Sequence, residues 1–145
     1  MRKLLIPLDG SELSEQALSG GPAQFPDETF EITLIRCIDL NDSISYAPDF
    51  PAEVPLERER HRSAELSHAR YLQEKAELLL ADGHRVHTVV VTGNPVDMIL
   101  RAAEQADLIV MTSNGRSGIK RWFMGSVAET VARRAKVPLL LLPSS

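Results

Sequence analysis

The chain has 145 residues, the size of one domain, and an ordinary globular composition with 43% hydrophobic and 25% charged residues. Sixteen Lys and Arg against twenty Asp and Glu give a net charge of −4, unlike the strongly basic balance of a dedicated nucleic-acid-binding protein. The one cysteine, Cys37, excludes an internal disulfide and suits a reducing compartment. No apolar run approaches the roughly 20 residues of a membrane-spanning helix. We therefore expect one domain over residues 1–145, soluble and cytoplasmic, that binds neither nucleic acid nor a membrane.

The first part of the chain predicts a strand, a helix and a second strand. Residues 3–8 form a nearly continuous apolar run, typical of a buried strand. Asp9 and Ser11 are candidate N-caps for the helix that follows, and Gly20-Gly21-Pro22 is expected to break or weaken that helix. Residues 30–38 are rich in β-branched and aromatic side chains and predict the second strand.

The middle of the chain predicts a long connection and a long helix. Residues 39–55 are polar and contain three prolines, which is typical of a mobile lid or a disordered connection. Residues 56–81 predict a helix, and Gly83 stands where a helix end belongs. Its expected apolar stripe consists of Leu66, Ala69, Leu72, Ala76, Leu79 and Leu80.

The remaining residues alternate strand and helix again. Residues 85–92 predict a third strand, and Asn94-Pro95 begins a helix with an N-cap and a proline at its first position. A fourth strand over 107–112, a helix over 125–135 and a fifth strand over 138–142 follow. Five strands alternating with helices predict an α/β fold, a parallel sheet with helices on both faces.

Several kinds of chemistry find no matching pattern. The sequence contains no G-x-x-x-x-G-K-[ST] phosphate loop, no G-x-G fingerprint and no G-x-S-x-G elbow. The histidine pairs His61 with His68 and His84 with His87 have no third ligand nearby, which favours surface histidines over a metal site. Cys37 lies in a predicted apolar strand without an adjacent base, so a packed, inert thiol is favoured over a nucleophile.

The connection after the fourth strand has features of an anion site. Ligands of open α/β sheets lie beyond the carboxyl ends of the strands. Residues 112–118 read Thr-Ser-Asn-Gly-Arg-Ser-Gly, and Gly125-Ser126 opens a helix, so both segments offer backbone N–H groups to a phosphate. From Ser113 onward there are six basic residues and one acidic residue, against ten and nineteen before it. The alternative is a flexible loop, a serine-capped helix and solvated basic helix faces.

These residues resemble a known family. The nucleotide motif of the universal stress protein family is G-x-x-G-(nine residues)-G-[ST]. The segment 112–126 resembles it, with Thr112-x-x-Gly115, nine further residues and then Gly125-Ser126. Residues 6–11, 93–95 and 137–142 resemble the first strand and turn, the turn before the third helix, and the terminal strand of that family. The resemblance covers the whole chain and implies an open, Rossmann-like five-stranded parallel sheet in the order 3-2-1-4-5. It also implies a homodimer that binds ATP between strands one and four.

The resemblance implies a set of ligand contacts. Pro7, Leu8 and Asp9 would hold adenine and ribose. Cys37, Ile38 and Met111 would wall the adenine pocket. The loop and the following helix would bind the phosphates through Thr112, Asn114, Gly115, Arg116, Gly125, Ser126 and Val127. Any Mg²⁺ would arrive with the nucleotide, since no carboxylate cluster marks a protein-built site. An N-cap role for Asp9 and plain core packing for the adenine-wall residues are the alternatives.

One position departs from the family motif, because Thr112 replaces its first glycine. If this position needs a positive φ, threonine costs about 1–2 kcal/mol of strain, roughly tenfold in affinity. If it needs close approach of the ligand, the threonine crowds the ligand or donates its hydroxyl to it. Gly115, Gly125 and Ser126 still favour the nucleotide-binding branch of the family.

Three functions are compatible with this site. The first is an ATP-binding stress sensor or regulator. The second is a dimeric interaction module whose nucleotide site does not function. The third is a slow ATPase, although the phosphate loop contains no histidine or carboxylate to position water, and the nearest acid is Glu129.

The last predicted strand bears on assembly. In the implied strand order, residues 138–142 form a sheet edge that carries no charge, and such an edge promotes association. Pairing with the same strand of a second subunit would satisfy its backbone groups. The alternative is an edge that stays solvated while the strand is covered by its own helices.

Overall fold

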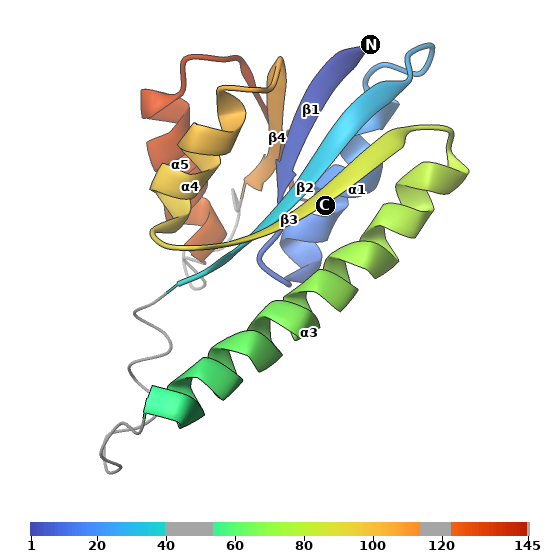
Figure 1. Ribbon diagram of the computed structural model, residues 1–145. Helices are drawn as coiled ribbons and strands as arrows, with labels where there is room; N and C mark the ends of the chain where they lie inside the picture. Colours follow the sequence, from blue (N-terminus) through green and yellow to red (C-terminus); the bar gives the residue numbers. More distant parts are fainter. Residues whose placement is uncertain (40–53, 114–122, 145) are drawn as a thin grey trace.

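The computed structural model describes residues 1–39, 54–113 and 123–144. The strands are β1 (Arg2–Pro7), β2 (Phe30–Ile38), β3 (Arg85–Thr92), β4 (Leu108–Ser113) and β5 (Leu139–Pro143). The helices are α1 (Glu12–Ala23), α3 (Val54–Ala81), α4 (Pro95–Ala103) and α5 (Phe123–Arg134). All neighbouring strands pair in parallel, in the order β3-β2-β1-β4-β5, which confirms the expected fold (Figure 1).

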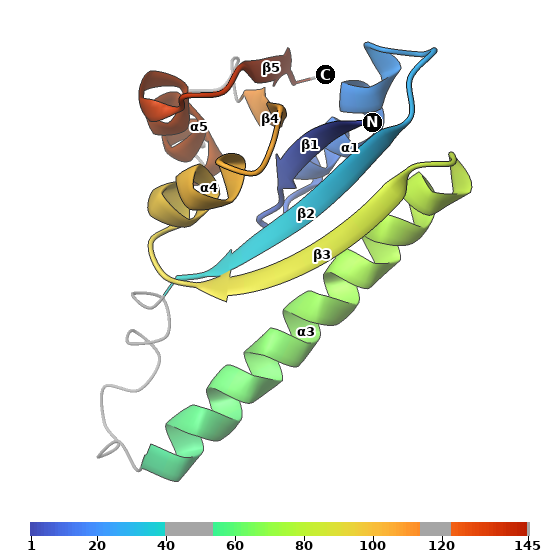
Figure 2. The ribbon, with the colours of Figure 1, turned by 45° about the horizontal axis from the view of Figure 1, so that its top comes forward.

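The helices form one layer on each face of the sheet. Helices α1 and α3 cover one face, and α4 and α5 cover the other (Figures 1 and 2). The chain changes face once, between β3 and α4, because right-handed crossovers that reverse direction along the sheet place their helices on opposite sides. No helix in the described part of the chain is long and apolar enough to cross a membrane.

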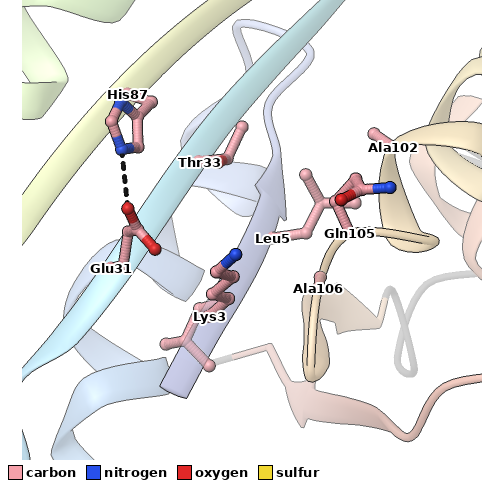
Figure 3. A pocket seen from close by; sticks show the side chains of 9 residues that line it. Lys3, Leu5, Glu31, Thr33, His87, Ala102, Gln105 and Ala106 are labelled. Atoms are coloured by element: carbon pink, nitrogen blue, oxygen red, sulfur yellow. Dashed lines mark hydrogen bonds and ion pairs between the residues drawn. The ribbon is translucent and has the colours of Figure 1, made fainter. Parts of the chain in front are cut away.

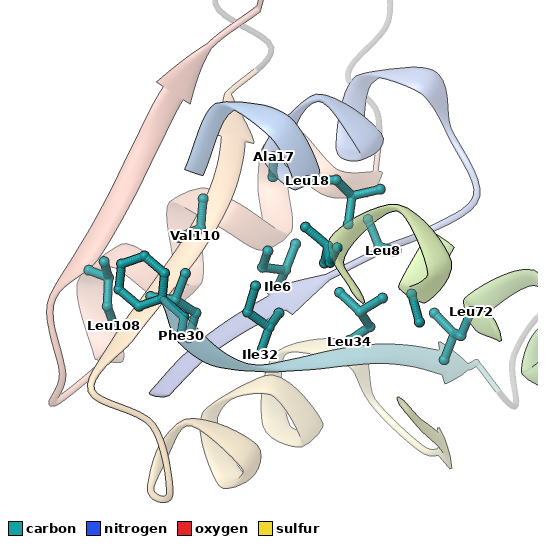
Figure 4. Packing of buried hydrophobic residues seen from close by; sticks show 13 residues of the cluster. Ile6, Leu8, Ala17, Leu18, Phe30, Ile32, Leu34, Leu72, Leu108 and Val110 are labelled. Atoms are coloured by element: carbon teal, nitrogen blue, oxygen red, sulfur yellow. The ribbon is translucent and has the colours of Figure 1, made fainter. Parts of the chain in front are cut away.

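The core has two halves because residues of a buried parallel strand point alternately to the two faces. Leu4, Ile6 and Leu8 pack toward α1 and α3, whereas Leu5 packs toward α4 and α5. Figure 4 shows the first half, in which the side chains of β1, β2 and β4 meet those of α1 and α3. The second half consists of Leu5, Ile35, Ile99, Ala103, Ile109, Met111, Val127, Ala128 and Val131.

Helix α1 does not break at Gly20-Gly21-Pro22 as expected, but runs through them to Ala23. A Cβ atom on Gly21 would lie 2.9 Å from Cγ1 of Val110, and one on Gly20 would lie 2.8 Å from Cδ1 of Leu142. The two glycines therefore let the helix approach β4 and β5 closely, and this packing offsets their poor helix propensity.

Helix α3 differs from the expectation at its start and along its stripe. It begins at Val54, and residues 40–53 of the expected connection lie outside the described residues. Leu72, Ala76 and Leu79 are buried as expected, but Leu66 and Leu80 are 58% and 52% exposed. The amino-terminal part of α3 extends beyond the sheet (Figures 1 and 2). Leu80 lies near the other end of α3, directly after the buried Leu79, so it is at the side of a contact face that is narrower than the expected stripe.

The other helix boundaries follow local signals. Asn94 caps α4, its Oδ1 accepting a hydrogen bond of 3.1 Å from the backbone N–H of Asp97, and Pro95 is the first helical residue. Gly83 ends the α3 turn with a φ of 93°. Helix α5 begins at Phe123, two residues before the expected start, which is the usual variation in where a helix end is placed.

Candidate functional site

The strand order places a candidate ligand-binding position where β1 and β4 lie side by side at the centre of the sheet. After β1 the chain passes to α1 on one face, and α5, the helix after β4, lies on the opposite face. Such a reversal of strand order is where open α/β sheets bind ligands, beyond the carboxyl ends of the strands. Asp9 follows β1 here, and Thr112 and Ser113 end β4.

The turn after β1 holds the Asp9 carboxylate in one orientation. Its Oδ1 accepts hydrogen bonds from the backbone N–H of Ser11 at 2.9 Å and from the Ser11 hydroxyl at 2.5 Å. The Ser11 Oγ accepts from the N–H of Ser14 at 3.1 Å, so Ser11 is the N-cap of α1. Asp9 is not the cap, and instead orients the capping residue. Gly10 makes the turn with a φ of 90°.

The end of β2 presents its two candidate residues to opposite faces. Side chains alternate along a strand, and Ile35 packs toward α4 and α5 whereas Leu34 packs toward α1 and α3. Cys37, two residues after Ile35, therefore lies on the α4/α5 side, and Ile38 lies on the α1/α3 side. Burial, together with the nearby Asp39 charge, raises the pKa of the half-buried Cys37 thiol to about 11. A thiol with this pKa is almost wholly protonated at neutral pH and is a poor nucleophile.

Thr112 is an ordinary strand residue. It pairs with Leu142 in the parallel register, and no non-glycine residue in the described ranges has a positive φ. Of the two alternatives for Thr112, backbone strain from a positive φ therefore does not apply. The side chain is 1% exposed, and its Oγ1 has no hydrogen-bond partner among the described residues. An unpaired buried hydroxyl costs about 1–3 kcal/mol.

The other candidates at the end of β4 and the start of α5 have different surroundings. Met111 is 1% exposed and Val127 is 5% exposed, and both pack in the α4/α5 half of the core. Gly125 is the third residue of α5, and Ser126 is exposed on the same turn. The phosphate-loop candidates Asn114, Gly115 and Arg116 lie outside the described residues.

Two of the basic residues expected near the phosphates lie far from the start of α5. Arg133 and Arg134 lie in the last turn of α5, about 15 Å from its start for a rise of about 1.5 Å per residue. Arg134 pairs with Asp97 at 3.5 Å and Arg133 pairs with Glu129 at 3.8 Å. These two residues belong to a solvated helix face, as the alternative interpretation held.

A polar network on the α1 and α3 side was not anticipated from the sequence. Arg36 Cζ lies 4.6 Å from the centroid of the Tyr71 ring, and the Tyr71 hydroxyl donates to Oε2 of Glu15 at 2.5 Å. Lys75 Nζ lies 3.2 Å from Oε1 of Glu15. Burial and the Glu15 hydrogen bond raise the pKa of Tyr71. The available sequence signal was Arg36 itself, a charge that follows the apolar pair Leu34-Ile35 in β2.

A separate hollow of about 220 Å³ lies at the amino-terminal end of the sheet. Figure 3 shows His87 and Glu31 on one side of it and Gln105 on the other, with Lys3 between them. His87 Nε2 lies 3.0 Å from Oε1 of Glu31, and this hydrogen bond, with the nearby Lys3 charge, lowers the pKa of Glu31. The hollow is at the opposite end of the strands from Asp9 and does not belong to the same site.

The described ranges hold no group of three or more His, Cys, Asp or Glu side chains placed to bind a metal ion.

Comparison with known proteins agrees with this architecture. The profile of the universal stress protein family matches residues 1–143. Universal stress protein MJ0531 of Methanocaldococcus jannaschii is 29% identical over 143 residues, covering 97% of this chain and 81% of that protein. The solved structure of MJ0577 from the same organism superposes with a TM-score of 0.81 and 26% identity, over 99% of this chain and 96% of that one. The chain belongs to the universal stress protein family.

Two further solved family structures contain nucleotides. One is a universal stress protein in complex with cAMP, with a TM-score of 0.64, 23% identity and coverage of 99% and 98%. The other is a universal stress protein family protein from Arabidopsis thaliana with AMP bound, with a TM-score of 0.64, 15% identity and coverage of 100% and 93%. At these identities the similarity to our chain is one of fold.

Proposed function

We propose that this chain binds an adenine nucleotide, ATP foremost, between the carboxyl ends of β1 and β4, and that it acts as a ligand-dependent sensor or regulator. The observation that carries the proposal is the meeting of β1 and β4 at a reversal of strand order, with the oriented Asp9 carboxylate beside it. The cAMP and AMP complexes of two proteins with the same fold support the choice of an adenine nucleotide.

In the proposed complex each contact has a chemical role. Asp9 accepts hydrogen bonds from the ribose hydroxyls, next to Pro7 and Leu8. Cys37 and Met111 share the α4/α5 side of the sheet and offer apolar surface to the base. The first turn of α5, with Gly125 and Ser126, offers the positive end of a helix dipole to the phosphates.

The remaining proposed contacts come from the loop before α5, through Asn114, Gly115 and Arg116. Any Mg²⁺ would be carried in by the nucleotide phosphates. We further propose that the protein acts in the cytoplasm, which suits the free thiol of Cys37.

Titration calorimetry with ATP and magnesium tests the proposal. We expect a dissociation constant in the micromolar range, about −8 kcal/mol. Absence of heat with millimolar ATP would contradict nucleotide binding and favour the dimeric interaction module. Sustained phosphate release with bound ATP would instead reveal the slow ATPase.

A charge variant locates the phosphates. Ser126→Asp places an acid near the start of α5, which favours the helix dipole by about 0.3–1 kcal/mol but repels a bound phosphate. We expect thermal stability to be retained and ATP affinity to fall at least tenfold. Ala132→Asp adds the same charge at an exposed position later on α5 and should leave ATP affinity unchanged. Equal ATP affinities in Ser126→Asp and Ala132→Asp would mean that the phosphates do not bind at the start of α5.

We also propose a homodimer that pairs the fifth strands, over residues 138–142, of two subunits. In the single chain β5 is a sheet edge, and Leu141 is 43% exposed on it. Leu139 and Leu140 are partly buried against the core, so the strand is covered in part by its own helices. An antiparallel pairing across a two-fold axis would satisfy the open backbone groups and bury Leu141.

A further inference from the structure

Arg36 lies directly behind the turn that carries Asp9. If Gly10 had a Cβ atom, that atom would lie 2.9 Å from Nη2 of Arg36 and 3.2 Å from both Cζ and Nη1. Three atoms of the guanidinium lie this close to the Cβ position, so the guanidinium packs against the Gly10 turn and leaves no room for a side chain there. The backbone of β1 reaches this point beside β2, since the N–H of Leu8 donates to the carbonyl oxygen of Ile35 at 2.9 Å.

The same guanidinium also contacts an aromatic ring. Arg36 Cζ lies 4.6 Å from the centroid of the Tyr71 ring, within the range of a cation–π contact. Tyr71 is itself held from α1, because its hydroxyl donates to Glu15 at 2.5 Å. Lys75 supports Glu15 at 3.2 Å. The planar guanidinium is therefore a plate that contacts both the Gly10 turn and an aromatic ring that is itself held in place.

We propose that Arg36 is a positioning residue for nucleotide binding, which sets the Asp9 carboxylate for the ribose hydroxyls by supporting the Gly10 turn from behind. Arg36 does not touch the nucleotide in this scheme. It lies on the α1/α3 side of the sheet, two residues after Leu34, whereas Cys37 and Met111 lie on the other side. Its effect passes to the ligand only through Asp9.

The contact of Arg36 with Gly10 matters because Gly10 has a positive φ of 90°. Glycine occupies both left- and right-handed backbone regions with little penalty, so a glycine turn needs outside contacts to keep one conformation. The Ser11 bonds orient the carboxylate relative to α1, and the guanidinium plate limits movement of the turn toward α3. A carboxylate displaced by about 1 Å loses most of a hydrogen bond to a bound hydroxyl.

This inference rests on the proposed function. It predicts that loss of Arg36 weakens only the part of the binding free energy that comes from the ribose hydroxyls. Affinities for ATP and for 2′,3′-dideoxy-ATP, which lacks both ribose hydroxyls, are measured by titration calorimetry. We expect the wild-type protein to prefer ATP by about tenfold, the value of roughly one good hydrogen bond to a charged group. In Arg36→Met the preference should fall to at most about twofold, with the dideoxy-ATP affinity nearly unchanged.

Two variants separate positioning from charge and from folding. Arg36→Lys keeps the charge but not the flat plate, so it should behave like Arg36→Met. Tyr71→Leu removes the aromatic ring against which the guanidinium packs and should lower the preference in the same way, even if Arg36→Met proves unstable. Arg85→Met, at an exposed position at the far end of β3, is the matched control and should keep the wild-type ratio.

The outcomes are distinct. A wild-type preference for ATP that persists in both Arg36→Met and Tyr71→Leu would overturn the positioning role and leave nucleotide binding intact. A restored preference in Arg36→Lys would overturn it too, because the charge alone would then suffice. Equal loss of both nucleotides would mark a merely structural residue. A wild-type protein that binds neither nucleotide would remove the proposed function and this role together.

Discussion

Thr112 is completely buried, and its hydroxyl has no hydrogen-bond partner in residues 1–39, 54–113 and 123–144, in a part of the sheet that is otherwise apolar. Leu108 and Val110 lie on the same side of β4 and pack in the core with α1, so the Thr112 side chain continues an apolar row. The residue that departs from the glycine motif is thus accommodated by the strand without strain, at the cost of one unsatisfied polar atom.

Replacing Thr112 by valine tests this description. Thr112→Val removes the unpaired hydroxyl while keeping the branched shape, so we expect the free energy of unfolding to rise by about 1 kcal/mol. Urea denaturation measures the change, and ATP affinity should stay within about twofold. A tenfold loss of affinity would instead mean that the hydroxyl donates to the nucleotide.

Cys37 predicts a particular dependence of reactivity on pH. With a pKa of about 11, only about one thiol in a thousand is ionised at pH 8, so alkylation by iodoacetamide should be slow. The rate should rise about tenfold per pH unit toward pH 11, because the thiolate is the reactive form. Mass spectrometry of protein quenched at intervals gives the rate. Alkylation at pH 7 as fast as that of a free cysteine would contradict the burial of the thiol.

At the scale of helices and strands, the contact between α1 and the sheet depends on two adjacent glycines with different neighbours. The Cβ of a residue at Gly21 would meet Val110, which is fully buried in β4. The Cβ of a residue at Gly20 would meet the end of the Leu142 side chain, which is only half-buried. A flexible chain end can move aside, whereas a buried β-branched residue in a strand cannot.

Alanine at the two positions should therefore have opposite effects. Gly21→Ala should lower the free energy of unfolding by about 1–3 kcal/mol through overpacking. Gly20→Ala should leave stability unchanged or raise it by up to about 1 kcal/mol, because alanine favours a helix. Thermal and urea denaturation of both variants measure this, and Val110→Ala should partly rescue Gly21→Ala. Equal destabilisation by both alanines would show that the close approach is uniform along the helix.

The strands could be predicted because each is a compact apolar run with clear ends. The sequence expectation for β2 and β3 agrees with the structure at both termini, and Asn94-Pro95 located the start of α4. The α3 stripe was wrong at Leu66 and Leu80 because apolar spacing shows which residues can face a core, but neither how wide the contact face is nor how far the sheet extends beneath a helix.

The candidate site was predictable only in part. The alternation of strands predicted which segments meet at the carboxyl edge, and the family resemblance supplied the strand order. Neither could show that Arg36 packs on Gly10, because that contact joins a side chain of β2 to the turn after β1. The Asp9–Ser11 contact is local, but either residue could have capped α1, and the sequence alone did not decide between them. The excess of basic residues after Ser113 overstated the charge near the loop, because it included Arg133 and Arg134. These two residues follow the loop in sequence but lie at the far end of α5.

For the whole molecule, the exposed leucine of β5 gives the test of assembly. Leu141→Lys places a charge on an exposed position of the edge, so the single chain should tolerate it while the proposed dimer should dissociate. Analytical ultracentrifugation at tens of micromolar, an order-of-magnitude choice for a weak dimer, should show a dimer for the wild type and a monomer for the variant. Lys136→Leu, near β5 but outside the strand, is a control for altered charge. A monomeric wild type would refute the dimer.

The central position of β1 has a consequence for the order in which the molecule is built. Its partner β2 follows within the next thirty or so residues, but its other partner arrives late, because Leu4 pairs with Leu108. While the chain is being synthesised, β1 to β3 with α1 and α3 emerge first, and one face of that half-sheet, including Leu5 and Ile35, has no cover until α4 and α5 follow. Such intermediates expose apolar surface and an open strand edge. Because β1 must wait for β4, the nascent chain keeps this apolar surface and strand edge open until its last fifty residues arrive.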